Sequence, residues 1–498
     1  MLQRHPNLFL FLAGALAVAA LPPINILPLI FLSLAFLILQ IVNARNTRQA
    51  FARGFWWGLG YFAVGFYWIN VALTVDWPRF AWLLPLCAIG LPAIVAIYSG
   101  LCSAAVFVTA NYTRRPRLGI ILLFPIFWTA LEILRGHALS GFPWNVIGTA
   151  FTDFSALFQI LSVVGIYGAG FIIALCAALC VAAFELPKHK FKYLGAAMVI
   201  IIAVAVFGAI RLQQDIPSEK ILNVRIVQPN IPQDEKWDMA SRQKNLGKLM
   251  ALTAEPSNLV PDLVVWPEAS VPYILSEVPE ARMIIAEHLP RGAILAAGTI
   301  RRDAQTQQFF NSIEYMDVSS EILSHYDKFH LVPFGEYVPF GKYIPLPVVT
   351  AFSGLGRGAG PQTQIIAGVG ISPLVCYEVI FPGEVVDVKN HPQLLLNVTN
   401  DGWYGNTIGP HQHLAQARAR AVEEGIPLVR AANTGISVAV DRFGRIQKSL
   451  SYGTDGMIDA EVIITDTAPP LSAGGGFYLY LSVLIGIYAV FVIRMTLR

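Results

Sequence analysis

Long apolar stretches dominate both ends of this 498-residue chain and constrain its fold more than any other feature. A helix that crosses the hydrocarbon core of a bilayer needs roughly 20 mostly apolar residues. The candidate stretches are residues 7–21, 24–43, 54–74, 83–110, 118–135, 160–186, 193–211 and 475–493. The sequence therefore predicts a polytopic α-helical membrane domain with about eight transmembrane helices.

The charged residues are divided unevenly along the chain. Residues 1–211 and 474–498 carry 15 Lys or Arg and 4 Asp or Glu, a net charge of +11, whereas residues 212–473 carry 20 and 28, a net charge of −8. We therefore expect a membrane domain in 1–211, a globular domain in 212–473 and a last transmembrane helix in 474–498. Only 13% of all residues are charged, which excludes an ordinary soluble protein. The acidic globular part also argues against a nucleic-acid partner.

The basic residues between the apolar stretches predict the orientation in the membrane. If eight helices alternate in direction, twelve Lys or Arg lie on one side and three on the other, and the side rich in positive charge is cytoplasmic. Both termini are then cytoplasmic, and residues 212–473 lie in the periplasm of a bacterial inner membrane. A signal peptide ending near Ala17-Val18-Ala19 is the alternative interpretation of the first stretch. The twelve are Arg4, Arg45, Arg48, Arg53, Arg114, Arg115, Arg117, Lys188, Lys190, Lys192, Arg494 and Arg498, and the three are Arg79, Arg135 and Arg211.

Glu132 is the one acidic residue well inside an apolar stretch. Such residues are candidates for function because a buried carboxylate is costly in a bilayer. Arg135 lies about one helical turn away, so a structural pair between the two is the interpretation that we favour.

The globular part predicts a layered α/β domain. Short runs rich in apolar and β-branched residues alternate with helix-like segments, and several runs are continuously apolar, as in strands that are buried on both faces. The last predicted helix ends at Gly425 and Pro427, which is a typical stop signal. The predicted strands are 221–228, 262–266, 293–299, 371–376, 393–398 and 435–441, and the predicted helices are 239–254, 278–289 and 411–424.

Cys376 is the only cysteine of the globular part. It follows an apolar run and precedes Phe381-Pro382-Gly383, so it lies where a strand opens into a turn. A lone thiol in an oxidising compartment is either a small buried hydrophobe or a reactive group. A reactive thiol needs a base or a cation nearby, because its ordinary pKa of about 8.5 leaves it mostly protonated.

Two other segments could supply that base and cation. Glu268 follows the predicted strand 262–266, and Lys328 lies among apolar and aromatic residues. Taken alone, Glu268 reads as a solvated charge at a strand end and Lys328 as a surface lysine with a buried stem. Together with Cys376 they form a base, a cation and a nucleophile, and an ammonium group can stabilise the oxyanion of an acyl intermediate.

Histidines offer an alternative base for Cys376. His411 and His413 could also bind a metal ion, but residues two apart at a helix start point to different faces, so we expect a helix-cap or surface role for them. The sequence predicts no metal site and no cofactor. The candidates for a Cys–His pair are His325, His330, His391, His411 and His413.

The three segments closely resemble the Glu–Lys–Cys signatures of the carbon–nitrogen hydrolase, or nitrilase, superfamily. With the membrane part included, the whole chain resembles the bacterial apolipoprotein N-acyltransferase family. The motifs are specific as a set and weak singly. They are Trp266-Pro267-Glu268-Ala269-Ser270, Lys328 followed by Leu331-Val332-Pro333-Phe334-Gly335-Glu336, Cys376-Tyr377-Glu378, and Asn397-Val398-Thr399-Asn400-Asp401-Gly402-Trp403.

The resemblance implies an αββα sandwich in which Glu268 is the general base, Lys328 stabilises the oxyanion and Cys376 is the nucleophile. It implies a ping-pong reaction in which Cys376 takes an acyl chain from a phospholipid, at the sn-1 position of phosphatidylethanolamine, as a thioester. The acceptor is the α-amino group of the diacylglyceryl-modified N-terminal cysteine of an apolipoprotein. The enzyme is expected to act as a monomer. Supporting or substrate-binding roles are implied for Trp237, Glu336, Tyr377 and Glu378.

Two other functions fit parts of the sequence. A membrane-tethered amidase or nitrilase would use the same three residues with water as the acceptor, but eight helices are more than a tether needs. A transporter would show several intramembrane charges or paired broken helices, and the sequence has Glu132 and little else. The glycine-rich segment 353–360 and the apolar loops 334–347 and 352–355 are candidates to cover or line the entrance of the site.

Overall fold

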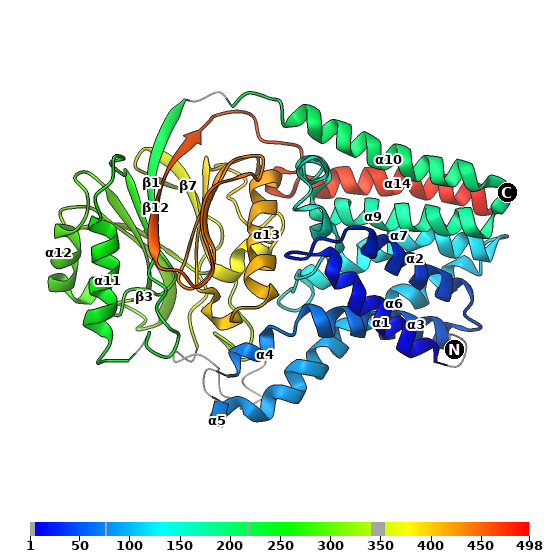
Figure 1. The fold of residues 1–498 in the computed structure, drawn as a ribbon, viewed down its shortest axis with the longest axis horizontal. Helices are drawn as coiled ribbons and strands as arrows, with labels where there is room; N and C mark the ends of the chain where they lie inside the picture. Colours follow the sequence, from blue (N-terminus) through cyan, green and yellow to red (C-terminus); the bar gives the residue numbers. More distant parts are fainter. Residues whose placement is uncertain (1–4, 75–76, 217–218, 237, 340–353, 498) are drawn as a thin grey trace. The chain divides into compact units, whose positions relative to one another are not determined.

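The computed structural model describes residues 5–74, 77–216, 219–236, 238–339 and 354–497 (Figure 1). Its contacts divide the chain into two units, each built from separate parts of the sequence. The helical unit consists of Met1–Asn70, Ala81–Gln214 and Pro470–Arg498. The sandwich unit consists of Val71–Phe80 and Asp215–Pro469.

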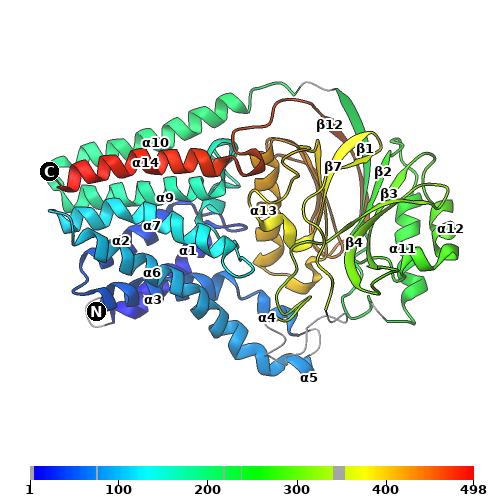
Figure 2. The same ribbon diagram turned by 180° about the vertical axis from the view of Figure 1, so that it is seen from behind.

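Long helices form the helical unit, and α9 is the most buried of its apolar segments (Figure 2). It packs against α7, α10, α14 and α2. At Gly165, φ is +63° and the helix is kinked, and a Cβ atom at this position would lie 2.6 Å from the ring of Phe477 at the start of α14. The long helices are α1 (Pro6–Ala17), α2 (Pro28–Val42), α3 (Thr47–Gly65), α6 (Leu91–Ala110), α7 (Pro116–His137), α9 (Leu161–Glu185), α10 (Lys190–Arg211) and α14 (Phe477–Leu497).

Five segments of the described chain are long and apolar enough to cross a membrane, which supports the membrane character of this unit. They match the predicted stretches from 83–110 onward. Helices α1 and α2 are apolar but shorter, and α3 begins at Thr47, well before the predicted stretch 54–74. The structure thus supports five candidate spans, and the count of eight stays a prediction. The five are Ala81–Ala110, Pro116–His137, Leu161–Glu185, Pro187–Arg211 and Phe477–Thr496.

Helices α1 and α3 pack through glycine. A Cβ atom at Gly14 would lie 1.9 Å from the carbonyl oxygen of Trp57, and one at Gly60 would lie 1.9 Å from the carbonyl oxygen of Phe11. Any larger residue at either position would push the two backbones apart. Small residues at helix contacts are typical of membrane bundles, where close packing replaces the hydrophobic effect.

Several predicted cytoplasmic segments lie at one end of the helical unit. The backbone N–H of Arg114 donates to the carbonyl oxygen of Thr496 near the end of α14, at 3.0 Å. Arg117 at the start of α7 forms an ion pair of 2.7 Å with Glu185 at the end of α9. The start of α1 lies at this same end (Figure 1). The basic loop after α6, the end of α9 and the last helix are therefore grouped, as the alternating topology requires.

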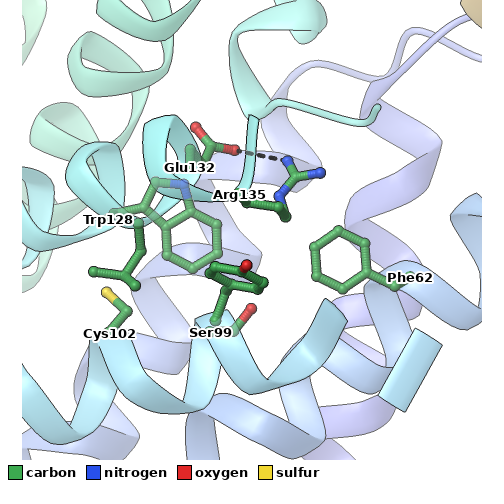
Figure 3. A pocket seen from close by; sticks show the side chains of 8 residues that line it. Phe62, Ser99, Cys102, Trp128, Glu132 and Arg135 are labelled. Atoms are coloured by element: carbon green, nitrogen blue, oxygen red, sulfur yellow. Dashed lines mark ion pairs between the residues drawn. The ribbon is translucent and has the colours of Figure 1, made fainter. Parts of the chain in front are cut away.

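The predicted Glu132–Arg135 pair is present but long, at 4.0 Å (Figure 3). The closest partners of both side chains belong to the main chain. Glu132 Oε1 accepts from the N–H of Ile147 at 3.0 Å, and Arg135 Nη1 donates to the carbonyl oxygens of Phe142 and Trp144 at 2.6 and 2.7 Å. Both charges therefore hold the segment that follows α7. They also line a small cavity with Phe62, Tyr98, Ser99, Cys102, Trp128 and Leu131.

Two six-stranded sheets face each other in the sandwich unit. One has the strand order β12-β1-β2-β3-β4-β5 and the other β11-β10-β9-β8-β7-β6. Strands β1, β2 and β3 are parallel, as are β7, β8 and β9, and antiparallel strands flank them. The strands are β1 (Lys220–Gln228), β2 (Leu263–Trp266), β3 (Ile294–Arg302), β4 (Phe309–Met316), β5 (Ile322–Asp327), β6 (Gln364–Ile366), β7 (Val369–Val375), β8 (Leu394–Thr399), β9 (Leu428–Ala432), β10 (Ser437–Val440), β11 (Ile446–Leu450) and β12 (Gly456–Ile464).

Helices cover the outer faces of both sheets, which gives the αββα layers that the sequence led us to expect (Figure 1). Helices α11 (Arg242–Ala254) and α12 (Pro279–Glu287) pack on the first sheet through a core that includes Leu249, Ile285 and Trp266. Helix α13 (Ile408–Glu424) covers the second sheet. Apolar side chains from both sheets, such as Val265 and Val398, fill the space between them.

All six predicted strands and all three predicted helices are present, with ends displaced by a few residues. Six strands were not predicted: β4, β5, β6, β9, β11 and β12. Most of these carry charged or polar residues, such as Arg430 in β9 and the exposed run of β11.

Candidate active site

Three strand ends bring Glu268, Lys328 and Cys376 into one buried centre. Glu268 lies two residues beyond β2, Lys328 directly follows β5, and Cys376 directly follows β7. The residues are 7%, 1% and 5% exposed. Strand ends are rigid positions with free side-chain directions, so residues distant in the sequence can be held together there.

Glu268 has one oxygen that is held and one that is free. Its Oε1 accepts from Asn311 Nδ2 at 2.8 Å and lies 3.6 Å from Lys328 Nζ. Its Oε2 is buried and has no hydrogen-bond partner among the described residues. A buried carboxylate oxygen without a donor is well suited to accept a proton.

Lys328 is held by a second carboxylate. Its Nζ donates to Glu336 Oε1 at 2.9 Å, and Asn311 Nδ2 also donates to that oxygen at 3.0 Å. Burial disfavours the charge on Lys328, but Glu336 and Glu268 outweigh this effect and raise the pKa of its ammonium group. Lys328 therefore stays positively charged at neutral pH.

The thiol of Cys376 is protonated at rest. Burial and the charge of Glu268 raise the pKa of Cys376 to about 12, although the charge of Lys328 opposes the shift. The Cys376 backbone has φ of +51°, a left-handed conformation that is uncommon outside glycine. Tyr404 Oη lies 4.0 Å from the sulfur. The charges of Glu268 and Lys328 thus both act on the thiol. A thiol with a raised pKa needs a base before it can act as a nucleophile.

Glu378 ties the cysteine turn to the lysine segment. Its Oε2 accepts from the N–H of Val375 at 2.7 Å, and its Oε1 accepts from Tyr326 Oη at 2.8 Å and from the N–H of Phe329 at 2.6 Å. Tyr377 is buried, and its ring lies edge-on to Phe381. The position of Glu378 suits the supporting role that the resemblance implies for it.

The expected helix-cap or surface role of His413 is wrong. The residue is 0% exposed, because α13 lies over the sheet that carries Cys376. His413 Nε2 donates to the carbonyl oxygen of Cys376 at 3.2 Å, and its Nδ1 lies 2.8 Å from Asp401 Oδ1. Arg430 Nη2 donates to Asp401 Oδ2 at 2.8 Å. This chain of buried groups contacts the backbone of Cys376.

Other histidines of the proposed Cys–His pair have carboxylate neighbours. His330 Nε2 lies 2.8 Å from Glu384 and His391 Nε2 lies 3.4 Å from Glu424, while His325 Nε2 lies 3.9 Å from Asp327. Among the residues that the structure describes, no group of three His, Cys, Asp or Glu could hold a metal ion.

The end of the glycine-rich segment packs on the lysine strand. The N–H of Gly358 donates to the carbonyl oxygen of Lys328 at 2.8 Å, and a Cβ atom at Gly358 would lie 1.9 Å from the carbonyl oxygen of Asp327. Only glycine permits this approach. Trp237 and residues 340–353, which include much of the predicted entrance loops, lie outside the described residues.

Two buried groups of this centre, Asn311 and Lys236, were not identified from the sequence. Asn311 joins the two carboxylates, and Lys236 Nζ donates to the carbonyl oxygen of Glu268 at 2.7 Å. Asn311 lies in a largely apolar strand and Lys236 follows a short polar run, so no local motif marks either residue. His413 was considered from the sequence as a base, a metal ligand or a helix-cap residue, whereas the structure shows it at the carbonyl oxygen of Cys376.

Comparisons with known proteins cover both units. A model of the apolipoprotein N-acyltransferase N-terminal domain matches residues 13–179, and a carbon-nitrogen hydrolase model matches residues 223–469. The chain is similar to the apolipoprotein N-acyltransferase of Rhodopseudomonas palustris, with 38% identity over 90% of this chain and 88% of the relative. That of Brucella melitensis biotype 1 is 39% identical over the same shares. The crystal structure of an amidase from Nesterenkonia sp. aligns with 55% of this chain and 98% of its own, at 22% identity and a TM-score of 0.37.

Proposed function

The chain belongs to the apolipoprotein N-acyltransferase family and is an acyltransferase, and we propose that Cys376, Glu268 and Lys328 carry the acyl group through a two-step transfer. The observation that carries this proposal is the buried Oε2 of Glu268, which has no hydrogen-bond partner among the described residues and lies in one centre with the ammonium group of Lys328 and the thiol of Cys376. A free base, a cation and a nucleophile are the groups that acyl transfer requires.

In the first step, Cys376 takes an acyl chain from a phospholipid. Glu268 Oε2 accepts the thiol proton while the sulfur attacks the ester carbonyl carbon, and the oxyanion that forms is stabilised by Lys328 Nζ. The carbon–oxygen bond to the glycerol then breaks, and Glu268 returns the proton to the leaving alkoxide. The products are a thioester on Cys376 and a lysophospholipid.

The high pKa of the thiol makes the base essential in this step. A sulfur whose pKa is about 12 is almost never ionised at neutral pH, so a preformed thiolate contributes little. Proton transfer to Glu268 must therefore accompany the attack. The resting enzyme is also protected by this arrangement, because a protonated buried thiol reacts slowly with other electrophiles.

In the second step, the α-amino group of the acceptor attacks the thioester. Glu268 accepts a proton from the attacking nitrogen, Lys328 again stabilises the oxyanion, and the bond between carbon and sulfur breaks. The sulfur leaves as a thiolate and regains its proton from Glu268. The product is an amide on the diacylglyceryl-modified N-terminal cysteine of an apolipoprotein, and no external energy source is needed because a thioester is already activated.

We further propose that the helical unit spans a bacterial inner membrane with eight helices and cytoplasmic termini, and that residues 212–473 form a periplasmic domain. The twelve-to-three distribution of basic residues supports this orientation. Both substrates carry long acyl chains, and withdrawing them from the bilayer would cost about 0.8 kcal/mol for each CH₂ group. An enzyme anchored in the same membrane avoids that cost.

The first test is the mass of the protein after incubation with phosphatidylethanolamine. We expect the intact parent protein to gain one acyl group, and Cys376→Ala to gain none. With a diacylated lipopeptide added, the adduct should disappear as the peptide gains an amide-linked acyl chain. Cys376 is buried and small, so alanine leaves the fold intact.

Two results would contradict the proposal. An acyl adduct that still forms on Cys376→Ala would place the nucleophile elsewhere. Release of free fatty acid without any acylated peptide would instead indicate a hydrolase, in which water is the acceptor. Cys102→Ala, in the helical unit, is the matched control and should acylate like the parent.

A further inference from the structure

A second lysine lies buried beside the proposed base. Lys236 occupies the loop between β1 and α11 and is 5% exposed. Its Nζ donates to the main-chain carbonyl oxygen of Glu268 at 2.7 Å. Lysine is almost never fully buried unless it is paired, because removing an ammonium group from water is costly.

The surrounding loop holds Lys236 in this inward position. Its neighbour Glu235 points outward and pairs with the exposed Lys244 at 2.9 Å. The carbonyl oxygen of Glu235 accepts from Asn245 Nδ2 at 3.1 Å, which attaches the loop to α11. The second contact fixes the backbone next to Lys236.

The charge of Lys236 is felt by the reacting groups. Burial lowers the pKa of Lys236 to about 8, although the negative charge of Glu268 opposes the shift. Lys328 has the carboxylates of Glu336 and Glu268 as neighbours, whereas the Nζ of Lys236 is held by a main-chain carbonyl oxygen. Two ammonium groups, those of Lys236 and Lys328, therefore lie in one centre with Glu268 and the thiol of Cys376.

We propose that Lys236 is a positioning residue of the acyl-transfer centre, which fixes the main chain of Glu268 and supplies a second positive charge beside the carboxylate and the sulfur. The inference rests on the proposed roles of Glu268 and Cys376. A positive charge at this place favours the ionised base before attack and the sulfur anion when it leaves. A neutral Lys236 would keep the hydrogen bond but lose the charge.

The test follows acyl-enzyme formation from phosphatidylethanolamine by intact-mass measurement at pH values from about 6 to about 9. The parent rate should decline as the pH passes about 8, where Lys236 loses its charge. Lys236→Met should be about 10-fold slower at neutral pH and lack that decline. Lys236→Arg stays charged, so it should keep most of the parent rate and decline only at higher pH. Lys244→Met is the matched control and should follow the parent profile.

A parent rate and pH profile in Lys236→Met would overturn the inference. If Lys236→Met does not fold, the arginine variant decides: a decline that stays at about pH 8 in Lys236→Arg overturns the proposal equally. Failure of the proposed function is recognised separately, because Cys376→Ala would then still form the adduct.

Discussion

Each unit buries a carboxylate and a cation, but their partners differ. In the helical unit, Glu132 and Arg135 are 4.0 Å apart, and their shortest hydrogen bonds go to main-chain groups of the segment that follows α7. In the sandwich unit, Glu268 and Lys328 are 3.6 Å apart, and their partners are side chains that surround a thiol. Burial of a charge pair therefore does not by itself indicate catalysis. The groups that the charges face decide the role.

The two buried pairs should differ most when their glutamates are replaced. Glu268→Gln keeps a side chain of the same shape and an oxygen for Asn311, but it removes the base. We expect acyl-enzyme formation to fall by about 10² to 10⁴-fold. Glu132→Gln keeps an acceptor for the N–H of Ile147 and should acylate near the parent rate. Stopped reactions analysed by intact mass measure both rates.

If acyl-enzyme formation slows equally in Glu268→Gln and Glu132→Gln, the two buried pairs do not differ in role. A Glu268→Gln protein that acylates normally would remove the base from the proposed mechanism. Elution of both variants as single detergent-solubilised species verifies that they fold.

Replacement of the two cations, Lys328 and Arg135, should also separate a catalytic pair from a structural one. Lys328→Met should slow acylation by about 10² to 10³-fold, because the oxyanion loses its cation. Arg135→Met should leave the acylation rate of the folded protein near that of the parent. It should lower thermal stability, because the carbonyl oxygens of Phe142 and Trp144 lose their donor, and each unpaired buried group costs about 1 to 3 kcal/mol. Acylation rate and melting temperature are measured on the same samples.

The assignment of Lys328 to catalysis and Arg135 to stability would be reversed by the opposite result, in which Arg135→Met is stable but acylates slowly and Lys328→Met acylates at the parent rate. In Lys328→Met, Glu268 and Glu336 lose a shared cation, so some loss of stability is expected there as well. The rate for each folded molecule is therefore the deciding quantity.

A third buried pair, Asp401 with Arg430, lies in the sandwich unit. It tests whether a buried pair in that unit can stabilise the fold, as we expect for Arg135 in the helical unit. Although burial opposes it, the charges of Arg430 and His413 lower the pKa of Asp401 to about 2, below the ordinary 3.8. The stabilisation is present above about pH 4 and is lost as the pH falls through about 2. Asp401→Asn should therefore cost about 2 kcal/mol of unfolding free energy at neutral pH, a difference that narrows only below about pH 4.

Denaturant unfolding of both proteins at several pH values measures this difference. A difference that already changes between about pH 6 and about pH 8 would assign the effect to His413 instead, since histidine ordinarily titrates there.

The layered α/β fold of the sandwich unit is predictable from its most apolar strands. Strands β2, β7 and β8 are continuously buried and read as apolar runs, so they were predicted. Strand β9 was missed because Arg430 interrupts it, and the charge is tolerated only because Asp401 and Asn397 receive it. Strand β11 was missed because an exposed edge strand has no apolar run. Tertiary partners, not local propensity, decide such segments.

The residues of the candidate site also fall into a group that the sequence predicts and a group that it does not. Glu268, Lys328 and Cys376 were nominated because each follows or interrupts an apolar run, and the structure brings them together. Lys236 and Asn311 were not, because a buried polar side chain is recognisable only once its partners are known. His413 was assigned to a cap or the surface from helix geometry alone, which carries no information on what packs over that helix.

Both units are completed by the last part of the chain. Strand β12 pairs with β1, the first strand of the sandwich, and α14 packs on α9 and α7 of the helical unit. During synthesis, the early helices and strands must therefore wait for roughly the last 40 residues before either unit is complete. A ribosome that stops early therefore releases two unfinished bodies rather than one finished domain.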